Sequence, residues 1–154
     1  MAALELKIPP LAQLVVAALL AIAIERLTPG LTIQYPYAVA AAIFLAVAGA
    51  GIAVAGVVAF RRKGTTVNPL DPGRSTKMVR DGVYRFSRNP MYLGMLLMLA
   101  AVVLYLSNVA AALVALPLFV WYMNRFQIVP EERFLQQKFG EEYTQFLREV
   151  RRWA

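Results

Sequence analysis

The chain contains neither histidine nor cysteine, so any chemistry must use carboxylates, arginines, lysines, tyrosines, backbone groups or a bound cofactor. One polar stretch, VYRFSRNP, ends at Pro90 and is followed by an apolar run as far as Leu106. Asn89 and Pro90 suit the N-cap and the first position of a helix, and they predict where that helix begins. A helix start alone leaves several residues of the stretch unexplained: Gly82, Tyr84, Arg88, Tyr92 and Gly94. We therefore regard residues 82–94 as a candidate functional site.

A second group of charged residues lies at the end of the last apolar run. Arg125 stands near the membrane end of that run, and Glu131 and Glu132 directly follow Pro130. An ionisable residue in a membrane segment is a functional candidate, although an arginine near a helix end also reaches the interface with its long side chain. The two glutamates equally suit the first turn of a helix, where the helix dipole favours negative charge. We expect Pro130 to interrupt the helix, so the spacing of Arg125 and Glu132 does not establish a common face.

The composition predicts that membrane helices position these residues. Apolar residues make up 60% of the chain and charged residues 16%, and both values depart from soluble averages toward membrane proteins. A bilayer core needs about 20 apolar residues per helix. We expect four transmembrane helices, over about residues 11–27, 37–60, 91–106 and 109–129. The expected fold is therefore an all-α integral membrane bundle, with residues 1–154 forming a single domain.

The basic residues predict the orientation in the membrane. Eight of the sixteen lysines and arginines lie between Arg61 and Arg88, and such a block beside apolar spans is typical of a cytoplasmic loop. We expect two spans within residues 1–60, a basic cytoplasmic loop over 61–90, a helical hairpin over 91–129 and a tail over 130–154. Both termini then lie on the cytoplasmic side. The net charge of +7 accompanies no nucleic-acid-binding motif, so we expect no nucleic-acid partner.

The tail is predicted to form an amphipathic helix and not a further span. Its apolar residues recur at intervals of three and four, which places them on one helical face. These residues are Phe134, Leu135, Phe139, Tyr143, Phe146, Leu147 and Val150. Gly140 is expected to divide the helix, which would lie on the membrane or cap the bundle.

Two motifs resemble one known family. GVYRFSRNPMYLG, residues 82–94, resembles the G-x-Y-x-x-x-R-(H/N)-P-x-Y-x-G signature of the isoprenylcysteine carboxyl methyltransferase family, whose relatives include the phospholipid N-methyltransferases. EERFLQQKFGEEYTQF, residues 131–146, resembles the E-E-x-x-L-x-x-x-F-G-x-x-Y-x-x-(Y/F) block of the same family. A weaker match is TTVNPLDPG, residues 65–73, where family members also carry a polar loop with proline. The resemblance covers about residues 65–153, a little over half of the chain.

The resemblance implies an integral membrane enzyme that transfers a methyl group from S-adenosylmethionine to a lipophilic acceptor. The cofactor would enter from the cytosol, and the acceptor (a carboxylate, an amine or a thiol) would approach through the membrane lipids. Carried over by motif position, the cofactor-binding residues would be Val79, Gly82, Tyr84, Arg88, Asn89, Pro90, Tyr92 and Gly94. The catalytic charges near the transfer point would be Arg125, Glu131 and Glu132. The resemblance implies no metal.

The chemistry of these residues suits the implied cofactor. The N–H groups of the helix that starts in the first motif and the guanidinium of Arg88 can bind its carboxylate. Tyr84 and Tyr92 offer aromatic faces to adenine or to the positively charged sulfonium. An amine acceptor must lose a proton, for which Glu131 or Glu132 would be the base, whereas a carboxylate acceptor needs none near neutral pH.

Two other classes of function remain open. A non-catalytic membrane protein could keep the family scaffold for interaction or assembly, and it would fail to bind the cofactor. A membrane reductase is the other alternative, because sterol reductases are thought to share a related helical core, and binding of NADPH would identify it. Asn89 stands where the well-known eukaryotic members of the family have histidine. Asparagine cannot titrate, which excludes a pH-dependent role at this position.

Overall fold

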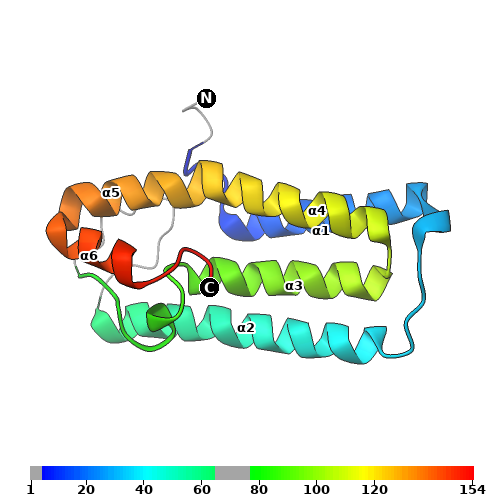
Figure 1. Cartoon of the computed structure of the whole chain (residues 1–154), viewed down its shortest axis with the longest axis horizontal. Coiled ribbons are helices and arrows are strands. Elements are labelled where there is room, and N and C mark those ends of the chain that lie inside the picture. Colours follow the sequence, from blue (N-terminus) through cyan, green and yellow to red (C-terminus); the bar gives the residue numbers. More distant parts are fainter. Residues whose placement is uncertain (1–4, 65–76) are drawn as a thin grey trace.

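The computed structural model describes residues 5–64 and 77–154, and in these ranges four apolar helices run alongside one another (Figure 1). They are α1 (Pro10–Leu27), α2 (Ala38–Lys63), α3 (Pro90–Leu106) and α4 (Val109–Met123). A π-helical turn, η5 (Asn124–Ile128), leads from α4 into α5 (Val129–Phe139), and α6 (Glu141–Glu149) follows. Short 3-10 turns, η2 (Pro29–Leu31) and η4 (Gly82–Arg85), lie after α1 and before α3. The weak motif at residues 65–73 lies outside the described ranges.

The prediction of an all-helical membrane bundle is confirmed. Within the described ranges, three helical segments are long and apolar enough to cross a bilayer: Pro10–Leu27, Ala38–Lys63 and Val109–Phe139. The expected third span, α3, has 17 residues and measures about 25 Å, which is slightly shorter than a bilayer core. Apart from the end of the fourth helix, which runs on to Phe139, the observed helix ends lie within a few residues of those expected, because prolines and glycines mark most of them.

Small residues allow α2 and α3 to pack at close range. A Cβ atom on Gly94 of α3 would lie 2.4 Å from the carbonyl oxygen of Gly49 in α2, and 2.9 Å from the backbone nitrogen of Ala53. Only glycine fits at this contact, since a methyl group there would collide with backbone atoms. Gly94 therefore places the start of α3, which carries the first motif, against α2.

Asn108 holds the opposite end of the bundle together. Its Oδ1 accepts a hydrogen bond of 2.9 Å from the N–H of Ala111 and so caps α4. Its Nδ2 donates to the Thr28 carbonyl at 2.9 Å and to Thr32 Oγ1 at 3.2 Å. Asn108, which lies between the last two expected spans, thus also joins the helical hairpin to the connection after α1.

Pro130 does not interrupt the helix, contrary to the sequence prediction. Proline has no N–H to donate to the carbonyl four residues earlier, and its ring crowds that carbonyl. The wider π-helical turn precedes Pro130, with the Val129 N–H bonded to the Asn124 carbonyl. The Phe126 carbonyl, which Pro130 cannot bind, accepts a hydrogen bond of 3.0 Å from the N–H of Leu6. The N-terminal segment thereby satisfies the group that proline leaves unpaired, and the chain stays helical.

The tail caps one end of the bundle. Gly140 has a positive φ of 53° and separates α5 from α6, as predicted. After this break α6 turns back, so that the C-terminus lies beside the start of α3 (Figure 1). The apolar face of α6 is buried, because Tyr143 and Phe146 pack in one cluster with Val79 and Tyr84. This packing brings the two motifs together.

Candidate cofactor site

A small cavity of about 80 Å³ lies where the start of α3 meets α5 and α6. Seven residues from the predicted site line it: Val79, Tyr84, Arg88, Asn89, Tyr92, Glu131 and Glu132. Aromatic residues from α2 and α6 also line it: Phe60, Tyr143 and Phe146. The structure therefore brings residues from both motifs to one place, although about forty positions separate them in the sequence.

Glu132 is held between two arginines. Arg88 Nη2 donates to Glu132 Oε1 at 2.9 Å, and Arg152 Nη2 donates to Glu132 Oε2 at 2.6 Å. Arg88 Nη1 also donates to the carbonyls of Val150 at 2.7 Å and Leu147 at 3.1 Å. The Arg88 side chain is only 11% exposed, so these charge-assisted bonds are shielded from water. Arg88 thus joins the first motif to both α5 and the end of α6.

The C-terminal segment is bound to the start of α3. The helix begins at Pro90 as predicted, but the Asn89 side chain donates to the Arg152 carbonyl at 2.9 Å instead of capping the first turn. The N–H of Arg88 donates to the Arg151 carbonyl at 3.0 Å. Sequence reasoning did not select Arg152 as a site residue. Its only signal in the sequence was the Arg-Arg-Trp stretch at residues 151–153.

Glu131 has a different environment from that of its neighbour. Its Oε1 accepts a hydrogen bond of 2.5 Å from Tyr92 Oη and one of 2.7 Å from Gln127 Nε2. Gln127 is fully buried in the π-helical turn, four residues before Glu131. Sequence reasoning also missed Gln127, although a glutamine one turn before a glutamate is a common helical pair. Glu131 therefore receives two uncharged donors, whereas Glu132 receives two cationic ones.

Two donors at the cavity have no hydrogen-bond partner among the described residues: Tyr84 Oη and Arg88 Nε. Tyr84 lies in η4, and its ring packs edge-on against Phe60 with centroids 5.4 Å apart. Burial, together with the charge of Glu131, raises the pKa of Tyr84 well above its usual range, so the hydroxyl keeps its proton. Unpaired buried donors are rare in folded proteins and are commonly found where a ligand binds. Each of these two groups can donate a hydrogen bond to a polar ligand in the cavity.

Comparison with known proteins identifies the family. A family model described as "Phospholipid methyltransferase" matches residues 37–142. This range contains the whole first motif and most of the second. The chain belongs to the phospholipid methyltransferase family. No solved structure matches the chain.

Proteins from one bacterium and from plants match parts of the chain. An uncharacterized protein of Haemophilus influenzae is 46% identical over 63 residues, which are 41% of this chain and 98% of that one. Protein-S-isoprenylcysteine O-methyltransferase B of Arabidopsis thaliana is 34% identical over 74 residues, 48% of this chain and 37% of that one. A probable protein-S-isoprenylcysteine O-methyltransferase of Oryza sativa subsp. indica is 36% identical over 74 residues, again 48% of this chain and 38% of that one. The match therefore spans little more than a third of the plant proteins.

Four of the residues selected through the family resemblance do not line the cavity as the structure describes it. Gly82 has a positive φ of 62° and opens η4, while Pro90 occupies the first turn of α3. Gly94 forms the close contact with α2. Arg125 binds Glu5 instead, with 2.8 Å between Arg125 Nη1 and Glu5 Oε1. The first three thus lie in elements that carry cavity-lining residues, and Arg125 lies against the N-terminal segment.

Proposed function

We propose that the protein is a membrane-embedded methyltransferase that transfers a methyl group from S-adenosylmethionine to a lipophilic acceptor. The observation that supports this proposal best is the junction of the two motifs around one cavity. Tyr92 binds Glu131 at 2.5 Å and Arg88 binds Glu132 at 2.9 Å, so each bond joins the first motif to α5. Membership of the phospholipid methyltransferase family supports the same reaction.

The chemistry of the lining residues fits this cofactor. When bound, the cofactor supplies a methyl group on a positively charged sulfur, next to an amino-acid carboxylate and an adenosine. Tyr84 Oη and Arg88 Nε are unpaired donors within the described structure, and they suit a carboxylate or the adenosine oxygens and nitrogens. The rings of Phe60, Tyr143 and Phe146 provide faces for adenine and for the sulfonium.

The site must open before a molecule of this size can enter. The cavity of about 80 Å³ is smaller than the cavities of about 150 Å³ that hold a single benzene. Tyr143 and Phe146 of α6 line one side of the cavity, and hydrogen bonds from Arg88 and Asn89 hold the residues that follow α6. We propose that release of α6 and residues 150–154 admits the cofactor.

The two glutamates have separate roles in this proposal. Glu132 is bound by Arg88 and Arg152, whose guanidinium groups occupy both of its carboxylate oxygens. Within the described parts of the chain, the Glu131 carboxylate accepts hydrogen bonds from two uncharged donors, Tyr92 and Gln127. If the acceptor is an amine, Glu131 is therefore the base that receives its proton, whereas a carboxylate acceptor needs no base.

Titration of the purified protein with S-adenosylhomocysteine, the product of the transfer, tests the cofactor site. We expect one saturable site per chain, and we expect Tyr84→Phe to weaken binding by roughly three- to tenfold, the worth of one hydrogen bond. The same variant should unfold at the same temperature as wild type or slightly higher, because it removes a buried hydroxyl that lacks a partner in the described structure.

The control for Tyr84→Phe is Tyr105→Phe, which removes a hydroxyl from an exposed tyrosine near the end of α3. It should change neither binding nor stability. If Tyr84→Phe bound S-adenosylhomocysteine as tightly as wild type does, the Tyr84 hydroxyl would not take part in cofactor binding. A folded protein that binds NADPH and neither S-adenosylmethionine nor S-adenosylhomocysteine would replace the methyltransferase proposal with a reductase, and one that binds none of them would favour a non-catalytic scaffold.

We also propose that the end of the molecule that carries the tail faces the cytoplasm. The end of α2, the start of α3 and the α5–α6 tail lie at this end (Figure 1). Because the chain has no cysteine, single-cysteine variants report accessibility without background. A membrane-impermeant maleimide should label Lys77→Cys only from the cytoplasmic side and Gly30→Cys, in the opposite connection, only from outside. The reverse pattern would invert the topology.

A further inference from the structure

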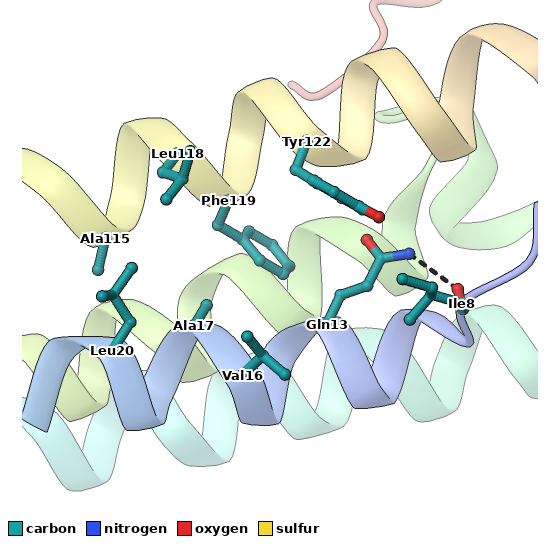
Figure 2. A pocket seen from close by; sticks show the side chains of 9 residues that line it. All are labelled: Ile8, Gln13, Val16, Ala17, Leu20, Ala115, Leu118, Phe119 and Tyr122. Carbon is teal, nitrogen blue, oxygen red and sulfur yellow. Dashed lines mark hydrogen bonds between the residues drawn. The ribbon is translucent and has the colours of Figure 1, made fainter. Parts of the chain in front are cut away.

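A second cavity lies between α1 and α4 and has a volume of about 180 Å³ (Figure 2). Its wall is apolar over most of its length, with Ala17 and Leu20 contributed by α1 and Ala115 and Leu118 by α4. None of the described residues lines both this groove and the cofactor cavity. The α1–α4 groove is therefore a separate feature of the molecule.

One end of the groove carries a polar group that is not paired. Gln13 is only 8% exposed, and its Nε2 donates to the Ile8 carbonyl at 2.8 Å. Its Oε1 is buried and has no hydrogen-bond partner in the described parts of the chain. Figure 2 shows this oxygen directed toward the Tyr122 side of the groove, away from Ile8. An unpaired buried amide oxygen destabilises the fold unless a donor binds it, so the groove offers one hydrogen-bond acceptor to a ligand.

The order of polar and apolar groups along the groove matches that of a bilayer lipid. Gln13 lies in the first turn of α1, at the end of the span, and Leu20 lies seven residues further along, about 10 Å deeper. Val16 and Leu118 are 64% and 44% exposed, so the groove opens on the face of the bundle that contacts lipid. A lipid with its head near the interface and its chain directed inward would meet the polar end and the apolar wall in the same order.

We propose that the α1–α4 groove binds one acyl or isoprenoid chain of a bilayer lipid, whose head group donates an O–H or N–H hydrogen bond to Gln13 Oε1. The volume of about 180 Å³ holds one segment of such a chain, since an apolar cavity of about 150 Å³ holds a molecule the size of benzene. The bound lipid is distinct from the methyl acceptor. A buried cluster packs between α1, α3 and α4 and reaches both sites. Phe119 of this cluster lines the groove, and Tyr92 of the same cluster lines the cofactor cavity.

A pair of photoreactive ligands tests the proposal. The first is a long-chain alcohol with a diazirine in its chain, and the second is its methyl ether, which lacks only the donor. In nanodiscs, the wild-type protein should bind the alcohol roughly three- to tenfold more tightly than the ether. Cross-links should map to α1 and α4. In Gln13→Leu the two ligands should bind equally, because the acceptor is gone.

A second variant tests the groove without changing its polar end. Ala17→Leu fills the groove and should lower cross-linking of both ligands at least threefold, whereas Ala23→Leu, at an exposed position of α1 outside the groove, should leave it unchanged. Thermal unfolding verifies that each variant is folded. Equal binding of alcohol and ether by wild type, or cross-links spread evenly over the lipid-facing helices, would overturn the proposal. Conversion of the alcohol into its ether with S-adenosylmethionine would instead place this ligand in the transfer site.

Discussion

Arg88→Ala is expected to release the tail and to weaken binding of S-adenosylhomocysteine by at least tenfold. The variant removes the donors of the Leu147 and Val150 carbonyls and leaves Arg152 as the remaining cationic partner of Glu132 in the described structure. The Glu132 side chain is only 16% exposed, so loss of one partner should lower the free energy of unfolding by about 3 kcal/mol. Trypsin cleavage after Arg148 and calorimetric titration measure the two effects.

The matched control is Arg85→Ala, three residues earlier in the same motif. Arg85 is exposed and does not line the cavity, so its removal should leave both cleavage and binding as in wild type. Tail cleavage and cofactor affinity in Arg88→Lys should lie between those of Arg88→Ala and Arg85→Ala. The lysine ammonium keeps the charge but lacks the planar guanidinium that reaches three partners. If Arg88→Ala showed the tail protection and affinity of wild type, the guanidinium would neither hold the tail nor shape the cofactor site.

Gly94→Ala is expected to have the largest effect of a single methyl group in this protein. The added Cβ would lie 2.4 Å from the Gly49 carbonyl oxygen, and a backbone atom cannot turn aside as a side chain can. The helices α2 and α3 must separate, which should cost about 3 kcal/mol. Because the cofactor motif begins α3, the same shift should weaken S-adenosylhomocysteine binding. Thermal unfolding followed by helical circular dichroism measures the stability.

Gly51→Ala makes the same chemical change on α2, at a position where no described atom would lie within 4 Å of the new methyl group. It should stabilise the protein by roughly 0.5–1 kcal/mol, since alanine favours a helix more than glycine does. The two variants are therefore expected to differ in sign. Similar effects of both would show that the close contact between α2 and α3 does not limit the stability of the bundle.

Much of the fold could be predicted from local sequence. The apolar runs gave the membrane helices because a backbone in lipid must satisfy its own hydrogen bonds. Asn89 and Pro90 marked the start of α3, and Gly140 marked the break in the tail. The two motifs together contain ten of the fourteen residues that line the cavity, and they were selected before any contact was known. These features depend on neighbouring residues, which a sequence displays directly.

The predictions that were wrong, and the residues that were missed, concern contacts between segments that lie far apart in the sequence. Pro130 stays within a helix because Leu6, far away in the sequence, donates to the carbonyl that proline cannot bind. Arg125 lies against Glu5 and not at the cavity. Arg152 binds Glu132 only because α6 turns back over the start of α3. Such partners depend on the path of the whole chain, so residue type and spacing do not reveal them.

By itself, the sequence determined the class of this protein: a bundle of membrane helices with two motifs of the phospholipid methyltransferase family and no histidine or cysteine chemistry. Helix formation in lipid and motif chemistry are local properties, and a single sequence shows them. Only the tertiary structure decided the different surroundings of the two adjacent glutamates, with Glu131 bonded to Tyr92 and Glu132 to arginines. It also decided that Gln13 faces an apolar groove, because burial and pairing arise only when separate helices pack.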